Sequence, residues 1–200
     1  MGDDSRKEQI MDAVIKLVTT VGVDKMTIRQ IAKEAGVSHA LVTYHYGNKT
    51  QLVGEAWLTA LARYAAEINA EVRKKSNLAR IEASFRVAFP DDDKQILPWR
   101  FWVAYWAEAA RTPNLSQYHG PPFERQRMAY AGYIRDAIDK GELVPGHADP
   151  VLSADLFQAL MYGLAVLTSI DEEAFSPNRA LSIAKHALDV FRAAGRARDS

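Results

Sequence analysis

The side chains best suited to chemistry gather between residues 39 and 49. This stretch holds two imidazoles, two phenols, a hydroxyl and an ammonium group, all of which hydrogen-bond to base edges or to phosphates. A helix that reads the major groove of DNA needs such groups, together with small residues near its start for close approach. The pattern therefore predicts an interface with double-stranded DNA.

The expected DNA contacts divide by chemistry into two sets. We expect contacts to bases or to the groove from the following residues: His39, Thr43 and His45, with the small Ala40 permitting close approach. We expect phosphate contacts from the hydroxyl and ammonium groups of Thr27, Ser38, Tyr44, Tyr46 and Lys49.

The sequence carries no recognisable catalytic motif. It lacks cysteine, which excludes disulfides, thiolate catalysis and cysteine-bound zinc, and it contains no G-x-S-x-G elbow, P-loop or dinucleotide fingerprint. The five histidines show neither the i, i+3 nor the i, i+4 spacing of paired metal ligands. We therefore expect a protein that is not an enzyme and that holds no cofactor and no metal.

Two short helices are expected to position the DNA-contacting side chains. Thr27 and Gln30 form a capping-box pattern that starts the first helix, and Gly36 supplies the left-handed exit that ends it. Ser38 is the N-cap of the second helix, which extends to Tyr46. Two helices joined by a three-residue turn form a helix-turn-helix.

The sequence T-I-x-x-I-A-x-x-A-G-V-S, followed by Y-x-Y-x-x-K-x-x-L, resembles the DNA-binding region of the tetracycline-repressor (TetR) family of bacterial regulators. The resemblance implies a homodimeric regulator in which a long helix, expected over residues 49–75, links the DNA-binding unit to the rest of the chain. The alternative is a helical ligand-binding or interaction protein without sequence-specific DNA binding. That alternative leaves Tyr44, Tyr46 and Lys49 without a common purpose.

The whole chain shows the apolar spacing of helices, so the expected fold class is all-α. We expect a helix-turn-helix DNA-binding domain over residues 1–50 and a helical effector-binding and dimerisation domain over residues 51–200. Residues 1–49 hold seven basic and six acidic side chains, which predicts only moderate non-specific affinity for DNA. No signal-peptide pattern opens the chain, and the nearly apolar run at residues 159–167 falls short of the ~20 residues that span a bilayer. A cytoplasmic protein without membrane contact is expected.

Five aromatic side chains fall within residues 99–106. On a helix, Trp99, Trp102 and Trp106 share one face, and Glu108 follows as a candidate counter-charge for a cation. The segment W-R-F-W-V-A-Y-W-A-E-A-A is similar to the C-terminal region of the choline-responsive BetI subgroup, which implies a choline-like effector. A neutral aromatic or lipidic effector fits the same surface, and aromatic stripes are as often plain core. The candidate ligand-binding residues are Trp99, Trp102, Tyr105, Trp106, Phe123 and Tyr130.

Two apolar helices are expected near the C-terminus, over residues 150–169 and 177–194, each opened by an N-cap followed by proline. The first is apolar nearly all round, so other parts of the protein must cover it, and the second brings apolar side chains of its own. Two such helices from each subunit form a four-helix homodimer interface, whereas a closed monomeric bundle is the alternative. A homodimer places two recognition helices about 34 Å apart on a palindromic operator. The expected interface residues are Leu156, Leu160, Gly163, Leu164, Leu181 and Leu188.

Overall fold

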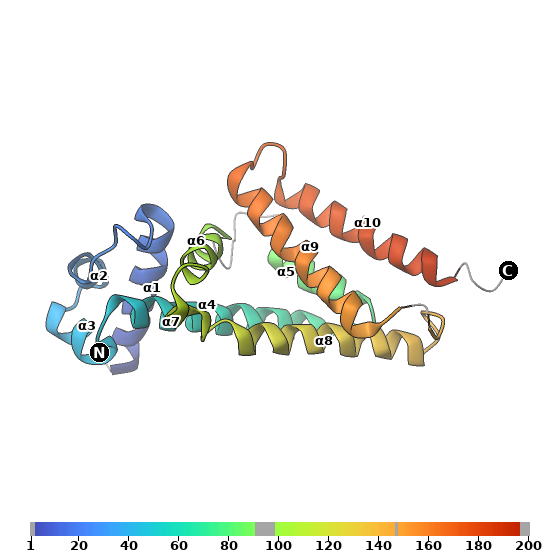
Figure 1. Ribbon diagram of the computed structural model, residues 1–200, viewed down its shortest axis with the longest axis horizontal. Coiled ribbons are helices and arrows are strands. Elements are labelled where there is room, and N and C mark those ends of the chain that lie inside the picture. Colours follow the sequence, from blue (N-terminus) through green and yellow to red (C-terminus); the bar gives the residue numbers. More distant parts are fainter. Residues whose placement is uncertain (1–2, 91–98, 147, 197–200) are drawn as a thin grey trace. The chain divides into compact units, whose positions relative to one another are not determined.

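The computed structural model describes residues 3–90, 99–146 and 148–196. Within these ranges the chain forms helices α1 to α10 and no strand, which confirms the all-α fold class (Figure 1). Packing divides the chain into two compact units. The first contains residues up to Tyr64 and residues 97–120, and the second contains residues 65–96 and everything from Pro121 onward. The functional boundary expected at residue 50 stays a prediction.

The first unit is built around the helix-turn-helix. Its α1 packs against α2 and α6 (Figure 1). The α1 side chains of Ile10, Val14 and Val18 are buried. The long helix α4 begins in this unit and continues into the second. The helices of the first unit are α1 (Asp3–Val21), α2 (Ile28–Ala35), α3 (His39–Tyr46), the first part of α4 (Lys49–Val72), α6 (Trp99–Ala109) and α7 (Pro113–Ser116).

A close approach between α4 and the segment after α7 depends on Gly54. This glycine is buried within α4, and a Cβ at its position would meet the Tyr118 ring at 2.5 Å. Trp57, almost one turn later, donates from Nε1 to the Tyr118 carbonyl at 3.3 Å. The Tyr105 hydroxyl of α6 donates to the buried Leu115 carbonyl at 2.9 Å. The segment that follows α6 is thereby tied to both α4 and α6.

The second unit packs α5, α9 and α10 together, as Figure 1 shows. Asp149 caps α9 by accepting hydrogen bonds from the next two amides available to it, those of Val151 at 2.8 Å and Leu152 at 2.9 Å. Ser176 caps α10 in the same manner. The helices are α5 (Ala79–Ala88), α8 (Gly120–Asp139), α9 (Pro150–Ile170) and α10 (Pro177–Arg196).

Helix α5 begins without a side-chain cap, although Ser76 and Asn77, which precede it, are residue types that favour the N-cap position. Leu78 occupies the N-cap position and forms no side-chain cap. Asn77 instead adopts a left-handed backbone with φ of 49°, and its side-chain oxygen accepts from the Lys140 ammonium at 3.2 Å. Because this tertiary bond uses the amide oxygen, the start of α5 is set by burial of Leu78 and Ile81 rather than by a cap.

Helix α9 is longer than the apolar run seen in the sequence. Its 21 residues are long and apolar enough to cross a membrane by length and composition alone. One face, however, carries Phe157, Met161 and Leu164 into the packed interior of the second unit. The other face of α9 is exposed to solvent and carries Leu152, Leu156 and Ile170.

Candidate nucleic-acid interface and ligand-binding clusters

The two caps predicted for the helix-turn-helix are confirmed. The Thr27 amide donates to the Gln30 side-chain oxygen at 2.8 Å while the Gln30 amide donates to the Thr27 hydroxyl at 3.2 Å. Gly36 takes the left-handed conformation at φ of 66° and ends α2. The Ser38 hydroxyl accepts from the Leu41 amide at 3.1 Å and starts α3. Local side-chain chemistry thus sets the boundaries of both helices.

The outward face of α3 presents the side chains expected to meet DNA. His39, Ala40 and Thr43 are exposed, and Tyr44 is 84 % exposed. Val42 lies on the opposite face and is fully buried. A helix anchored on one side with exposed polar groups on the other can enter a groove without disturbing its own unit.

The remaining predicted DNA contacts lie closer to the protein. His45 and Tyr46 are half-buried, and the His45 ring meets the Tyr44 ring edge-on at 5.2 Å. The Thr43 hydroxyl donates to the His39 carbonyl at 3.1 Å, so it keeps its acceptor capacity for a base amino group. The Thr27 hydroxyl is already used within the capping box. Tyr44, by contrast, is largely exposed.

Lys49 has a structural partner that the sequence did not indicate. Its ammonium group donates to the carbonyls of Val23 and Asp24 at 3.0 and 3.3 Å, in the turn between α1 and α2. Two of its three hydrogens therefore hold this turn against the start of α4. A phosphate contact from Lys49 stays a prediction, and any substitution of it also perturbs the fold.

The aromatic side chains of α6 gather into a cluster with a residue from α4. The rings of Trp99, Trp102 and Trp106 follow one another at 6.2 Å between neighbours. Trp57 stacks on Tyr105 at 4.1 Å and meets Trp102 edge-on at 4.2 Å. Sequence reasoning missed Trp57, because nothing in the periodicity of α4 relates it to α6. We call these five residues the tryptophan cluster.

The charges and donors around the tryptophan cluster bear on what it can bind. Glu108 accepts from Arg111 at 2.6 Å and from the Thr112 hydroxyl at 2.7 Å, so its charge is already paired. The buried Trp102 Nε1 has no hydrogen-bond partner among the residues that the structure describes. Burial raises the pKa of Tyr105 and lowers that of His119, which keeps both neutral near pH 7. The cluster is therefore an uncharged, π-rich group of largely buried rings that includes the Trp102 donor.

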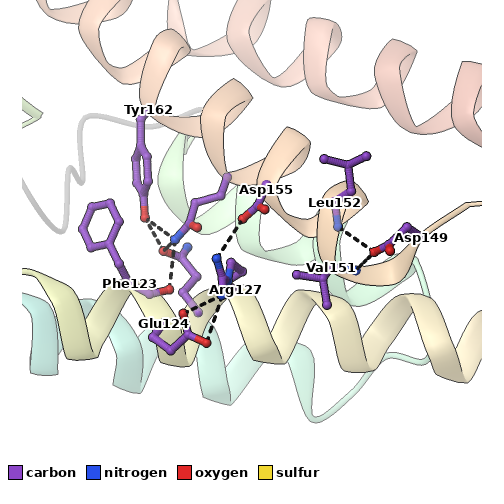
Figure 2. A network of polar contacts seen from close by, with 10 residues as sticks. Phe123, Glu124, Arg127, Asp149, Val151, Leu152, Asp155 and Tyr162 are labelled. Carbon is purple, nitrogen blue, oxygen red and sulfur yellow. Dashed lines mark hydrogen bonds and ion pairs between the residues drawn. The ribbon is translucent and has the colours of Figure 1, made fainter.

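The predicted ligand residues Phe123 and Tyr130 belong to the second unit, apart from the tryptophan cluster in the packing division. There Phe123 joins an amide and phenol network between α8 and α9 (Figure 2). Gln158 donates to the Phe123 carbonyl at 3.2 Å and to the Tyr162 hydroxyl at 3.0 Å. Tyr162 in turn donates to Gln126, and its ring lies 4.8 Å from that of Phe123. No pattern in the sequence indicates this network, since the residues that it joins across α8 and α9 lie more than 30 positions apart in the chain.

Tyrosines of the second unit are held in the neutral form. Burial raises the pKa of Tyr130 to about 12, an effect that neighbouring Ser84 and Gln126 partly offset. Burial likewise raises the pKa of Tyr162, against a smaller opposing effect of Gln158. These hydroxyls act as hydrogen-bonding groups rather than as charges. Across the described ranges, no three His, Asp or Glu side chains come together as metal ligands.

The predicted dimer residues separate by burial. Leu156 and Gly163 are exposed and Leu160 is half-buried. The others are at most 8 % exposed and pack inside their own subunit: Leu164, Leu181 and Leu188. A side chain buried in its own core offers little surface to a partner, so the interface, which stays a prediction, is best tested on the exposed residues.

The solvent-facing side of α9 carries a continuous apolar row, which we call the α9 stripe. Its members recur at alternating spacings of three and four residues, the repeat of a helix-packing seam. No atom lies within 4 Å of a Cβ built on its glycine, so a partner helix can approach closely there. The α9 stripe consists of Leu152, Leu156, Ala159, Gly163, Val166 and Ile170.

Two protein families match this chain. Residues 10–56 match the bacterial regulatory proteins of the tetR family, and residues 77–193 match the family described as BetI-type transcriptional repressor, C-terminal. The second match alone covers more than half of the 200 residues.

Individual proteins show the same relationship. The chain is 23 % identical over 181 residues to the HTH-type transcriptional regulator BetI of Serratia proteamaculans. The aligned region covers 89 % of this chain and 88 % of that protein. A transcriptional regulator from Pseudomonas aeruginosa PAO1 has a similar fold, with a TM-score of 0.82, 24 % identity and coverage of 96 % of this chain and 93 % of that one. A regulator from Saccharomonospora viridis, solved in complex with choline, has a TM-score of 0.83 at 19 % identity and covers 94 % of this chain and 97 % of its own.

Proposed function

The chain belongs to the TetR family of transcriptional regulators and carries a BetI-type C-terminal domain, and on this premise we propose that it is a homodimeric repressor. Its relatives are DNA-binding regulators, not enzymes. The observation that carries the proposal is α3, a helix capped at Ser38, anchored by buried Val42 and polar on its outward face. The exposed hydroxyl and imidazole groups of such a helix point away from its own unit, where they can contact DNA.

In the proposed complex, each subunit of the dimer places α3 in the major groove of one half of a palindromic operator. His39, Thr43 and His45 meet base edges, and Tyr44 holds a phosphate on the flank. The N-terminus of α3 adds backbone amides that favour a phosphate even though residues 1–49 carry a charge of only +1. The protein acts in the cytoplasm, where its operator is found.

The test compares two substitutions on α3 by fluorescence anisotropy with the protein's own upstream DNA at physiological salt. Tyr44→Phe removes one exposed phosphate donor from each subunit, so we expect affinity to fall about tenfold or more for all sequences, because each phosphate hydrogen bond contributes about 1 kcal/mol. Thr43→Val keeps the shape of the side chain and removes its acceptor, so we expect altered preference between bases. Equal loss on every sequence for both variants would contradict the assigned roles.

We propose that dimerisation uses the α9 stripe together with the exposed side of α10. Val190 on α10 is 54 % exposed and extends the apolar surface. The number of dimers on one operator is left to the binding stoichiometry in the same experiment.

We propose that the tryptophan cluster holds the effector that releases the repressor. Its indole faces attract a quaternary ammonium, and the Trp102 Nε1–H is available to an oxygen acceptor such as the hydroxyl of choline. The similar regulator solved with choline supports this ligand class. Binding would favour a dimer with a different tilt of α4, which is a shift in population between states that bind and do not bind DNA.

The effector proposal is tested by adding choline, and separately a neutral aromatic compound, to the operator complex. We expect choline to release the wild-type protein, and Trp102→Phe, which keeps a ring and removes the donor, to require a higher choline concentration. Release by the neutral compound alone would retain the regulator and discard the cation.

A further inference from the structure

Two buried hydrogen-bond donors in the second unit lack acceptors. The Tyr130 hydroxyl, on a side chain only 2 % exposed, has no hydrogen-bond partner among the residues in the described ranges. The same holds within those ranges for Nε of Arg127, one turn earlier on α8. Residues three apart on a helix lie on the same face, so the two donors point to one region. An unmet buried donor is costly, and two side by side indicate that an acceptor from outside the chain completes them.

The groups around these donors do not supply that acceptor. The Ser84 hydroxyl, itself buried, donates to the Arg80 carbonyl at 3.0 Å. It lies near enough to Tyr130 to affect the tyrosine's pKa, as Gln126 does, yet neither group meets the geometry of a hydrogen bond to that hydroxyl. The oxygen of Gln126 already accepts from Tyr162 and from Gln158. The nearby acceptors are therefore engaged or misaligned.

The charges near the two donors decide what kind of acceptor fits. Arg127 pairs with Glu124 at 3.0 Å and lies 3.8 Å from Asp155 across to α9 (Figure 2). These three groups sum to one negative charge, which disfavours an anion. A cation is also disfavoured, because the two unmet groups direct positively polarised hydrogens at the ligand, and the nearby Tyr133 ring already holds the guanidinium of Arg80 at 5.1 Å. A neutral oxygen acceptor satisfies both donors without an uncompensated charge.

An apolar partner for such a ligand is present beside the donors. The rings of Phe123 and Tyr162 lie at a tilt of 35° to each other, from α8 and α9 respectively (Figure 2). Tyr162 points its hydroxyl into the amide network while its ring stays beside Phe123. The site thus combines donors at one end with aromatic carbon at the other.

We propose that α8 and α9 form a second ligand site, separate from the tryptophan cluster, for a neutral small molecule that carries a carbonyl oxygen next to an aromatic or aliphatic group. The carbonyl accepts from the Tyr130 hydroxyl and from Arg127 Nε, and the apolar part packs against Phe123 and Tyr162. This site differs in chemistry from one that holds a quaternary ammonium, which offers no acceptor at its charged end.

The test follows thermal unfolding of the full chain with acetophenone, benzamide and methyl benzoate as neutral carbonyl probes and choline as the cationic probe. We expect at least one carbonyl probe at millimolar concentration to raise the Tm of the wild-type protein by about 2 °C or more, on the order of the shift that modest binding produces. Tyr130→Phe should abolish that shift. Tyr133→Phe makes the same chemical change one turn along α8, keeps the ring under Arg80 and should retain the shift.

The ligand-free variants give a second readout that a merely structural hydroxyl would not give. Since Tyr130→Phe deletes an unmet donor, its Tm without probe should rise by about 2–4 °C. A lower Tm for Tyr130→Phe, a carbonyl shift that persists in this variant, or no carbonyl shift in the wild-type protein would each overturn the proposal. A crystal structure with water alone on Tyr130 after soaking with the probes would do so as well. Operator binding is measured in parallel. A protein that binds its operator but shows no carbonyl effect overturns the second ligand site alone, whereas loss of operator binding bears on the proposed repressor function.

Discussion

Leu156→Ala tests whether the α9 stripe forms the dimer interface. Leu156 is 61 % exposed in the subunit, whereas Leu164, two turns along the same helix, is 3 % exposed. Both leucines were expected at the interface from the sequence. In the structure Leu156 faces solvent and Leu164 lies in the core, so replacing each in turn distinguishes dimer contact from core packing.

The expected loss of dimer affinity follows from the exposed fraction of the side chain. The substitution removes three carbons, worth about 2.4 kcal/mol if they were fully transferred from water at ~0.8 kcal/mol each. Only the 61 % that is exposed remains for a partner to bury, which leaves about 1.5 kcal/mol per subunit. A two-fold interface contains the residue twice, so we expect about 3 kcal/mol, or a dimer dissociation constant raised on the order of 100-fold.

Sedimentation equilibrium over a wide concentration range measures the dimer dissociation constant, and urea unfolding measures stability. Leu156→Ala should weaken the dimer with little change in the unfolding of the subunit. Leu164→Ala should lower the unfolding free energy by about 2–5 kcal/mol through the cavity it leaves. An unchanged dimer constant for Leu156→Ala, beside a weakened dimer for Leu164→Ala, would refute the reasoning.

Three further predictions concern the first unit, each measured by urea unfolding. Gly54→Ala should lower the unfolding free energy by about 1–3 kcal/mol, because the added Cβ meets the Tyr118 ring. In a protein that also carries Tyr118→Ala, the same change should leave the unfolding free energy unchanged or raise it. An equal loss in both backgrounds would disprove the contact. Lys49→Met should lower the unfolding free energy by about 1–2 kcal/mol, because it removes two hydrogen bonds to backbone carbonyls. An unchanged unfolding free energy would show that Lys49 does not stabilise the fold and would leave it only the role of a phosphate contact. Because burial lowers the pKa of His119 from 6.5, the unfolded state binds its proton first, so stability should fall as the pH drops below 6.5 and His119→Asn should lose less between about pH 7 and 5.

Local signals in the sequence were sufficient to predict the helix-turn-helix. The hydroxyls of Thr27 and Ser38 and the glycine at position 36 act on amides and dihedral angles within four residues of themselves. Such interactions form wherever these residues occur in this order, so no knowledge of the rest of the fold is needed. The same holds for the Asp149 cap of α9.

Periodicity was less informative where a helix is apolar on all sides. The apolar pattern of α9 indicates that the helix is covered nearly all round, but it does not indicate which leucines face the core of the subunit and which face a partner. Leu164 and Leu156 have the same chemistry, and only packing against α5 and α10 separates them. The start of α5 is not visible in local signals for a related reason, since the Asn77 side chain accepts a hydrogen bond from Lys140, in a distant part of the chain.

The sequence by itself determined the all-helical class, the caps of the DNA-reading helix and the kind of side chain on its outward face, because these depend on neighbours in the chain. The tertiary structure alone decided that Trp57 completes the tryptophan cluster, that Phe123 and Tyr130 belong to a different unit, and that the Tyr130 donor is left without an acceptor within the described residues. Each of these depends on which side chains meet across tens of residues. The spacing of these residues along the chain does not indicate that they are in contact, because packing depends on shape and burial rather than on sequence distance.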